Sequence, residues 1–548
     1  MNHWFIVTVA GNHATITARV SSSVFLTLFQ LHKLQLRSRN MLTEILFAAL
    51  ALITAILIFK LTKLAFVEVA CHYRLRLQAY SLRGKLGLKG PKVNLLLGNV
   101  LLFTDPAVKW NESQKRLFQK LKQIYGNVYG LYLGPQLNIV VTDLDLAKDI
   151  LIKKFSHFTD RSHIAILENK PMSDCLFNLK QNEWKEVRCT VAHAFSNKVM
   201  RQMATASLPK IKKFIDSLRP YADSLEEFDI YKNFQVLTVD VIAQCAFALN
   251  LDGCGEVSKR FLGNCRRLFD MLFPELNMLL KMCVPFAEFS KAEQQLVQDL
   301  HALLLQKRVA KGIHLSDDSI IANAMVFLLA GYETSSTAMG FASWLLAKHR
   351  NVQSKLQEEI DKTFSNNADE KEFEIIERMP FLDAVFRETL RLFPPLVLLV
   401  VRTCVKACTI RNVKFVPGVQ VLFPTFTIQR DEDVWMDAEE FKPERLAFAF
   451  SHTLAFICFH SFLQDQSNHH PMAWLPFGAG PRNCIGKRFA EIQFKITMIH
   501  LLRNYNLSLC KSSQDPIRTK SNGATIKPSE GVVLQITKRV RQFNPQGI

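Results

Sequence analysis

The sequence lacks several features that mark common classes of protein. Its 12 cysteines include no CxxC pair and follow no regular spacing, which argues against a disulfide framework or a zinc module and favours buried thiols in a reducing compartment. No GxGxxG fingerprint occurs, so no flavin- or nicotinamide-binding loop is visible. No internal repeat or low-complexity tract is found either.

Charge is also sparse. Only 21% of the 548 residues are charged, whereas 49% are hydrophobic, and 41 are Phe. Such a chain can bury a large core, which excludes global disorder. The excess of 68 Lys and Arg over 49 Asp and Glu gives a net charge of +19, suited to nucleic acid, anionic lipid or an acidic protein. The basic residues are spread along the chain and no nucleic-acid-binding module is visible, so we expect no nucleic-acid partner.

Residues 41–67 are predicted to form a transmembrane anchor. The segment Leu42–Val67 is almost wholly apolar, with an uncharged run from Ile45 to Phe59, and it is long enough to cross a bilayer if Lys60 and Lys63 extend to the interface. A cleaved signal peptide or a buried core helix would be the alternatives. Eight Lys or Arg and one acid follow between residues 60 and 92, which predicts a cytosolic location for this flank.

Residues 1–40 form a basic extension that competes with this orientation, because they carry four Lys or Arg and no acid. Translation from Met41 would remove the conflict and place the main domain in the cytosol. We favour that interpretation over a mitochondrial transit peptide, which is rarely followed by a strong anchor.

A basic linker, residues 68–95, leads into one continuous body, residues 96–548. Strand patterns are confined to residues 127–142, around Gly134-Pro135, and to residues 397–428, around Pro417-Gly418. The fold class is therefore predicted to be mainly α with a small β subdomain. Helical periodicity covers 144–155, 181–198, 205–217, 236–250, 288–309, 317–348, 351–364, 380–393 and 486–503.

The most informative segment is Phe477-Gly-Ala-Gly-Pro-Arg-Asn-Cys484-Ile-Gly486, a glycine-rich loop that leads into a helix-patterned stretch. A cysteine at a helix N-terminus is stabilised as a thiolate by free backbone N–H groups and by the helix dipole, and a thiolate can bind iron. Gly478, Gly480 and Gly486 would let the backbone pass close to a flat macrocycle, and Arg482 could pair with a carboxylate at its edge. The ordinary alternative is a buried cysteine in a turn.

This decapeptide resembles the haem-binding signature of the cytochrome P-450 superfamily, the haem-thiolate monooxygenases, in its microsomal eukaryotic form. The resemblance implies a fold with haem between a long central helix and the loop that carries the cysteine. It also implies haem b (iron protoporphyrin IX) with Cys484 as axial thiolate and metal ligand. The implied cofactor-binding residues in the loop are Phe477, Gly478, Arg482 and Gly486.

A second family segment, Ala330-Gly-Tyr-Glu333-Thr334-Ser335, lies within a long apolar helix. Taken alone, a threonine there bonds back to the preceding turn of the helix. The resemblance implies that this bond opens a notch above the haem, and that Thr334 and Glu333 are catalytic residues that relay protons.

The pair Glu388 and Arg391, with Arg445 in Phe441-Lys-Pro-Glu-Arg445, matches a third family pattern. An isolated i,i+3 ion pair is worth only about 0.2–0.5 kcal/mol, but the resemblance implies a buried triad with a structural role. A fourth segment, Trp184-Lys-Glu-Val-Arg188, places an indole N–H and a guanidinium on one helix face. By resemblance, Trp184 and Arg188 bind haem propionates, as does Arg402, although Arg391 and Arg411 are close to it in sequence.

The implied function is insertion of one oxygen atom from O₂ into a lipophilic small molecule. The electrons would come from an NADPH-dependent flavoprotein reductase, for which Lys487, Arg488 and Lys495 are the predicted docking residues. The implied location is the endoplasmic reticulum membrane, with the catalytic domain facing the cytosol, and the alternative is the mitochondrion. Competing functions are a haem-thiolate isomerase or dehydratase, and a catalytically impaired haem-binding relic.

The sequence departs from the family pattern between Arg445 and Cys484. The surplus lies in residues 447–464, which are too apolar for a surface loop. They would be either an inserted helix that contacts the membrane or a partner, or a retained intron or other gene-model error. The second explanation is favoured because residues 1–40 would be a similar defect. The interval from Trp184 to Thr334 is also short, which leaves the substrate-lid region undefined.

Overall fold

In the computed structural model, the chain divides into two compact units, Met1–Leu77 and Gln78–Ile548. The structure describes residues 4–11, 14–21, 50–55, 59–60, 63, 74–103, 110–161, 172–247, 263, 316–366, 372–398, 400–447, 469–521 and 525–540.

The first unit contains an antiparallel hairpin, in which β1 (Trp4–Gly11) pairs with β2 (Ala14–Ser21). Of the predicted anchor, the structure describes residues 50–55, 59–60 and 63, all helical. Within the described residues, no helix combines the length and the apolar character needed to span a membrane.

The second unit is mainly helical. Its long central helix is α12 (Asp317–Lys348). The N-cap residue is Ser316, whose side chain accepts a hydrogen bond from the N–H of Ser319. This capping satisfies one of the free N–H groups at the helix start. The other main helices are α3 (Trp110–Tyr125), α5 (Gln181–Ala192), α6 (Asn197–Ser217), α8 (Ile230–Phe247), α13 (Arg350–Asn366), α15 (Pro380–Leu392) and α18 (Lys487–Asn504).

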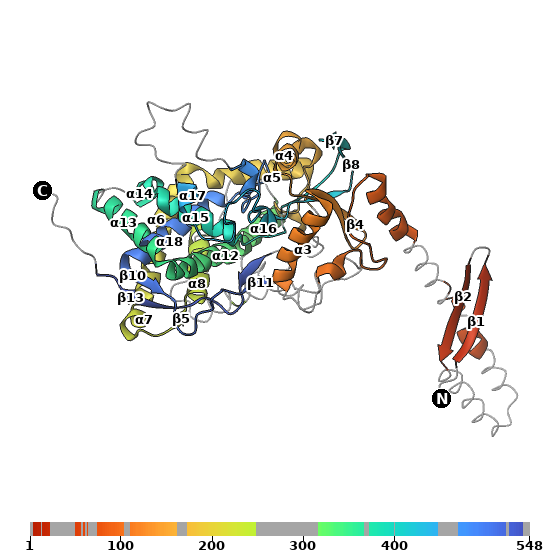
Figure 1. The fold of residues 1–548 in the computed structure, drawn as a ribbon, viewed down its shortest axis with the longest axis horizontal. Helices are drawn as coiled ribbons and strands as arrows, with labels where there is room; N and C mark the ends of the chain where they lie inside the picture. The colour runs from red at the N-terminus through yellow and green to blue at the C-terminus, as the bar shows by residue number, and fades with distance from the viewer. Residues whose placement is uncertain are drawn as a thin grey trace, which may run out of the picture. The chain divides into compact units, whose positions relative to one another are not determined.

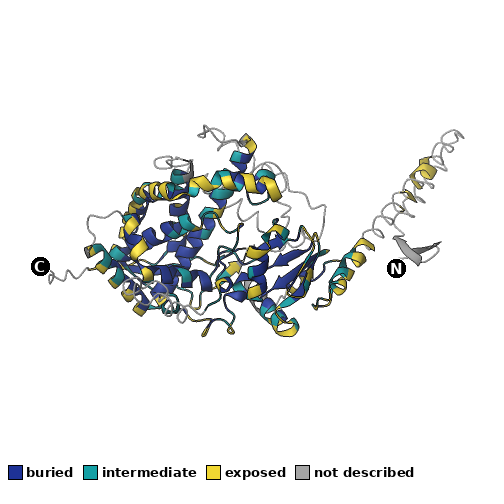
Figure 2. Cartoon of the chain, turned by 90° about the horizontal axis from the view of Figure 1, so that it is seen from above, coloured by how far each residue is buried: buried dark blue, intermediate teal, exposed yellow. Residues whose placement is uncertain are grey.

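The helices pack around α12, which Figure 1 shows at the centre of the helical part of this unit. One large core joins apolar side chains of α6, α8, α12, α13, α15 and α18. Figure 2 shows that the buried residues of these helices face one another, while their exposed residues lie at the periphery. Burial on this scale is the main force that fixes α12 in place.

The strands form small sheets, and the largest has the order β3-β4-β9-β6. The hairpin of β3 (Val128–Leu133) and β4 (Gln136–Val141) is antiparallel, β9 (Gln420–Leu422) runs parallel to β4, and β6 (Val401–Thr403) closes the order. The two-stranded sheets pair β7 (Cys408–Ile410) with β8 (Val413–Phe415), and β11 (Thr519–Ser521) with β12 (Ile526–Pro528). A third sheet has the order β10-β13-β5, from Tyr505–Ser508, Val533–Lys538 and Phe228–Asp229.

The mainly α fold class and the hairpin within 127–142 are confirmed. The predicted break between the helices 181–198 and 205–217 was misplaced, because α5 ends at Ala192 and α6 begins at Asn197. The confinement of strands to two regions was also wrong, since β10 to β13 lie near the C-terminus. These strands are only three to six residues long. β13 pairs with β10 and with the distant β5, whereas β11 and β12 pair with each other, so each short strand depends on its partner more than on its own pattern. The predicted helix 288–309 and the segment 448–464 lie outside the described residues.

The start of α15 is held by a carboxylate from another helix. Both oxygens of Glu359, on α13, accept hydrogen bonds, from the N–H groups of Phe381 at 2.8 Å and Leu382 at 2.9 Å. Pro380 occupies the first helical turn, where its missing N–H costs nothing. Desolvation raises the pKa of Glu359, although these two N–H groups oppose the rise. Glu359 therefore sets where the helix carrying Glu388 and Arg391 begins.

We expect Glu359→Ala to lower the free energy of unfolding by about 1–3 kcal/mol, because it leaves two N–H groups at the start of α15 without their acceptor. Urea unfolding followed by circular dichroism would measure the change. Glu358→Ala is the matched control, since Glu358 is exposed on the same helix. Equal effects of the two substitutions would contradict the capping role.

Candidate functional site: a cysteine loop beside four arginines

The loop that carries Cys484 is closed by its own backbone. The N–H of Cys484 donates to the carbonyl of Phe477 at 2.8 Å, and the N–H of Asn483 donates to the carbonyl of Gly480 at 3.0 Å. The thiol follows directly at the start of α18, whose N-cap residue is Gly486. Cys484 is exposed as a residue, which suits a sulfur that would hold a metal ion.

The thiol is exposed even though protein surrounds it closely. Desolvation raises the pKa of Cys484, and this rise is opposed by the N–H groups of Gly486 and Lys487 and by the charges of Arg161 and Arg188. These groups favour the thiolate form, so they are suited to a cysteine that binds a cation.

Two of the three loop glycines are required by the backbone. Gly478 and Gly480 have positive φ values of 67° and 72°, a region that other residues rarely adopt. A Cβ at position 480 would also lie 1.9 Å from the carbonyl oxygen of Leu151. A Cβ at Gly486 would meet only the Cys484 sulfur, at 4.0 Å, so the space beside that glycine is open.

Four guanidinium groups gather beside this loop: those of Arg161, Arg188, Arg402 and Arg482. Arg402 and Arg482 are almost fully buried. Arg161 donates to the carbonyl of Arg482 at 3.0 Å, and Arg402 donates to the carbonyl of Ala479 at 3.3 Å. The cluster therefore holds both the start and the middle of the loop.

The arginines repel one another. Desolvation, together with the neighbouring charges of Arg161 and Arg188 and against the charge of Asp160, lowers the pKa of Arg482 to about 9. Burial lowers the pKa of Arg161 to about 10. Desolvation, followed by the charges of Arg161 and Arg482, lowers the pKa of Arg402 well below its ordinary value. Such a buried cluster of cations is costly unless anions compensate it.

Several donors of this cluster have no protein acceptor. They are Nε of Arg161, Nε of Arg402, and Nε and Nη1 of Arg482. Buried donors are normally paired, and guanidinium groups match carboxylates in shape and charge. The unpaired donors therefore fit a ligand with carboxylates, as the two propionates of haem would be, and the exposed thiol fits its iron.

Trp184 and Arg188 take different contacts from those predicted. The ring of Trp184 lies under the guanidinium of Arg482, 4.3 Å from its Cζ, which is a cation–π contact. Arg188 holds Asn483 through its carbonyl, at 3.1 Å, and its side-chain oxygen, at 3.0 Å. Both residues thus support the loop next to Cys484, and their predicted contact with propionates stays a prediction.

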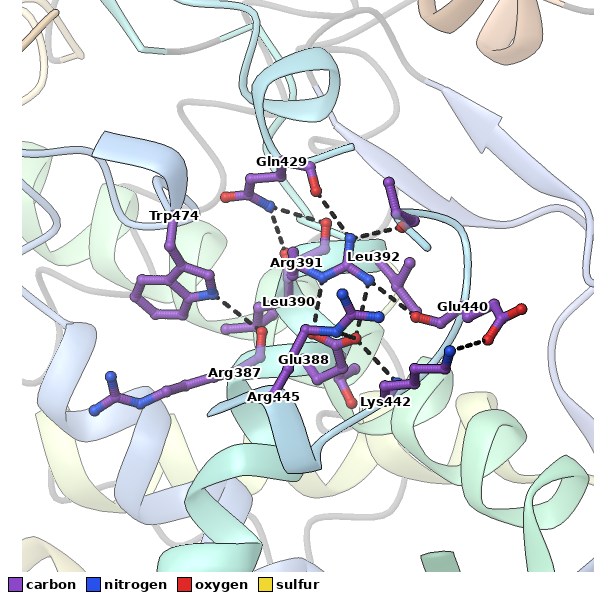
Figure 3. A network of polar contacts seen from close by, with 12 residues as sticks. Arg387, Glu388, Leu390, Arg391, Leu392, Gln429, Glu440, Lys442, Arg445 and Trp474 are labelled. Carbon is purple, nitrogen blue, oxygen red and sulfur yellow. Dashed lines mark hydrogen bonds and ion pairs between the residues drawn. The ribbon is translucent and has the colours of Figure 1, made fainter. Parts of the chain in front are cut away.

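Figure 3 shows the predicted triad together at the C-terminal half of α15. Glu388 accepts from Nε and Nη2 of Arg391 at 2.8 and 2.9 Å, and Nε of Arg445 lies 3.2 Å from the same carboxylate. The side chains of Glu388 and Arg391 are fully buried. Arg391 also donates to the carbonyls of Gln429, Ala438 and Glu440. This satisfied network makes the pair structural rather than a reactive site.

Gln429 connects the triad to the cysteine loop. Its Nε2 donates to the carbonyls of Leu390 and Arg391, at 2.8 and 3.0 Å, and its Oε1 accepts from the N–H of Leu475 at 2.8 Å. The carbonyl of Leu475 accepts from the N–H of Gly478 at 3.0 Å. The position of the thiol is therefore tied to α15 through hydrogen bonds that the sequence motifs do not reveal.

The bond from Thr334 back to the preceding turn of α12 is present, and the predicted notch stays a prediction. The hydroxyl of Thr334 donates to the carbonyl of Ala330 at 2.6 Å. Ala330 is exposed and Gly331 and Thr334 are partly exposed, whereas the rest of this helix from Ser335 to Ala347 is buried. Glu333 points elsewhere: it is buried against α8, where Tyr231 donates to its Oε1 at 2.8 Å. The two predicted relay residues therefore face different surroundings.

Of the arginines near position 402, only Arg402 joins the cluster. Arg411 pairs with Asp149 and Asp145, and Arg391 belongs to the triad. The prediction of Lys495 as a docking residue was wrong, because its side chain is buried and pairs with Asp383 at 2.9 Å.

Arg161 was missed. It follows Asp160, which bridges to Thr403 of the sheet edge, and no sequence motif marks it. Only the fold brings it to within hydrogen-bond distance of residue 482, more than three hundred positions away.

Comparisons with known proteins agree with this arrangement. The family model described as Cytochrome P450 matches residues 88–298 and 284–535. The chain is 30% identical to Cytochrome P450 3A29 of Sus scrofa over 496 residues, which is 84% of this chain and 93% of the relative. It is 32% identical to Cytochrome P450 3A17 of Cavia porcellus, covering 83% and 92%. It is 27% identical to Thromboxane-A synthase of Macaca fascicularis, covering 84% and 94%.

We expect Gly480→Ala to destabilise the protein more than Gly418→Ala. Both glycines have positive φ, 72° and 87°, but a Cβ at Gly418 meets nothing within 4 Å, whereas one at Gly480 meets the Leu151 carbonyl. Strain alone costs about 1 kcal/mol, and the clash adds to it. Thermal unfolding of the two variants would measure the difference, and similar melting temperatures would contradict it.

Proposed function

The chain belongs to the cytochrome P450 family of haem monooxygenases, and from that premise we propose that it inserts one oxygen atom from O₂ into a lipophilic small molecule. It is an oxidoreductase of this family. The observation that supports the proposal most directly is the convergence of an exposed thiol and four guanidinium groups with unpaired buried donors. The thiol suits the iron of haem b and the unpaired guanidinium donors suit its two carboxylates, whereas a wholly apolar ligand would leave these donors unpaired.

The proposed roles of the chain's residues follow from their positions. Cys484 would hold the iron as a thiolate, and Arg161, Arg402 and Arg482 would hold the propionates. Gly486 would leave room beside the sulfur, and Phe477 packs beside Trp474 and Phe386 at the base of the loop. When bound, haem supplies the activation of dioxygen.

Thr334 is proposed to hold and pass on a proton. Thr334 is partly exposed, one turn after Ala330, which is exposed. Its bond to Ala330 fixes the oxygen in one orientation. Glu333 is proposed to supply the proton from the buried side of the helix.

The reaction needs electrons from a partner, which we propose is an NADPH-dependent flavoprotein reductase. Lys487 is exposed and Arg488 partly so at the start of α18, close in sequence to Cys484. Their charge suits an acidic partner surface. We propose that residues 96–548 form the catalytic domain and that residues 41–67 anchor it in the endoplasmic reticulum membrane, facing the cytosol.

A second candidate is a haem-thiolate isomerase that rearranges peroxides without a reductase. The relative named thromboxane-A synthase keeps this alternative open. Incorporation of ¹⁸O from labelled O₂ into a panel of apolar probes, dependent on NADPH and reductase, would support the monooxygenase. Conversion of an organic hydroperoxide without reductase, and no incorporation of label, would instead support the isomerase.

Cys484→Ser is expected to abolish the red-shifted absorption band that the reduced protein gives with carbon monoxide, because the hydroxyl does not replace the thiolate as iron ligand. Difference spectroscopy of the haem-loaded protein measures the band. Cys408→Ser, a partly buried cysteine on β7, is the matched control. An unchanged band in the Cys484 variant would refute the proposed ligand.

Thr334→Ala is expected to raise the hydrogen peroxide released per NADPH oxidised by about fivefold, because protons then reach reduced oxygen less selectively. Reductase, NADPH and O₂ suffice for the measurement, so no substrate need be known. Thr205→Ala is the matched control, since Thr205 also bonds back by four residues, at 3.1 Å to Arg201, on the exposed face of α6. A peroxide ratio equal to that of the control would count against the relay.

A further inference from the structure

Glu333 lies in a polar contact site between α12 and α8. Tyr231 donates to its Oε1 at 2.8 Å, and Gln235, one turn further along α8, donates Nε2 to its Oε2 at 3.3 Å. Only 3% of Glu333 is exposed. Desolvation and the nearby charge of Glu333 raise the pKa of Tyr231 well above its ordinary value, so its hydroxyl remains a donor. Two neutral donors alone compensate a buried carboxylate poorly.

A cation from the C-terminal part of the chain completes the site. Nζ of Lys527, on β12, lies 3.6 Å from Oε1 of Glu333. Lys527 stands directly opposite Lys520 across the pair β11–β12, and like charges in that position destabilise a hairpin. Lys520 is exposed, whereas the Lys527 side chain is 18% exposed. The attraction of Glu333 offsets the repulsion and draws Lys527 inward.

The hairpin that supplies Lys527 is anchored beside the segment that leads to Arg402. The N–H of Ile526 donates to the carbonyl of Pro395 at 2.9 Å, and Thr525 forms a bridge with Leu396. Lys527 is thus one residue away from a fixed backbone contact. Its ammonium group is therefore held at a defined place relative to α12, as a positioning role demands.

We propose that Lys527 is a positioning residue that holds the Glu333 carboxylate in place for proton delivery towards Thr334. The role rests on the proposed function, because Glu333 matters to the reaction only if α12 relays protons. Tyr231 and Gln235 orient the carboxylate from one helix, and Lys527 places a positive charge 3.6 Å from it. Without Lys527 the carboxylate loses its cation and its fixed place.

The first experiment measures hydrogen peroxide released per NADPH oxidised, with reductase and O₂ and no added substrate. We expect Lys527→Met to raise this ratio about twofold or more, and Lys527→Arg to restore it, since the guanidinium keeps the charge. Lys520→Met, which removes the same charge from the opposite strand, should leave it unchanged. Addition of Lys527→Met to Glu333→Gln should produce no further rise. Equal ratios for Lys527→Met and Lys520→Met, or fully additive effects, would overturn the proposal.

A second experiment needs no turnover. Urea unfolding of wild type, Lys527→Met, Glu333→Gln and the double variant forms a double-mutant cycle, and we expect an interaction factor of about twofold or more in the unfolding equilibrium constant. Additive effects would overturn the pairing itself. If the wild-type protein oxidised no NADPH with the reductase, the proposed function and the catalytic role of Lys527 would fail together, while this cycle would still decide whether Lys527 holds Glu333.

Discussion

The structure depends most on an electrostatic constraint: several guanidinium groups are buried side by side without enough acids to balance them. Burial lowers the pKa of Arg161, Arg402 and Arg482, repulsion from Arg161 also lowers the pKa of Arg402 and of Arg482, and four donor nitrogens of these side chains lack a protein acceptor. A fold tolerates such a cluster only if the rest of its packing is strong or if a bound anion compensates the charge. The large helical core provides the first, and the propionates of a haem would provide the second.

The surrounding scaffold holds the reactive sulfur through a continuous series of hydrogen bonds. Glu359 fixes the start of α15, and Glu388 and Arg391 fix its end. Gln429 then connects the end of α15 to Leu475 through side-chain hydrogen bonds. Glu388, Arg391 and Gln429 are buried, Glu359 is half-buried, and all four are hydrogen-bonded, which is the kind of support that a metal ligand requires.

The two proposed relay residues, Thr334 and Glu333, lie on different faces of the central helix α12. Thr334 opens towards the partly exposed stretch around Ala330, whereas Glu333 is buried against α8 and paired with Lys527. Adjacent residues of a helix point about 100° apart. Proton transfer between them therefore needs a change in side-chain position or an intervening water. The contacts on the buried side of the helix fix the place from which Glu333 would deliver a proton.

The sequence by itself determined the family, the mainly α fold class and the long helix 317–348, and it predicts Cys484 as the residue that would hold the iron. These follow from local patterns: a glycine-rich loop that needs positive φ, and an apolar period that needs burial. The tertiary structure alone decided that Arg161 joins Arg402 and Arg482, that Lys495 is buried, that Lys527 meets Glu333, and that short strands form near the C-terminus. The contacts of the three charged side chains depend on partners far away in the chain, and the short strands depend on pairing with another strand, so neither can be read from a residue and its immediate neighbours.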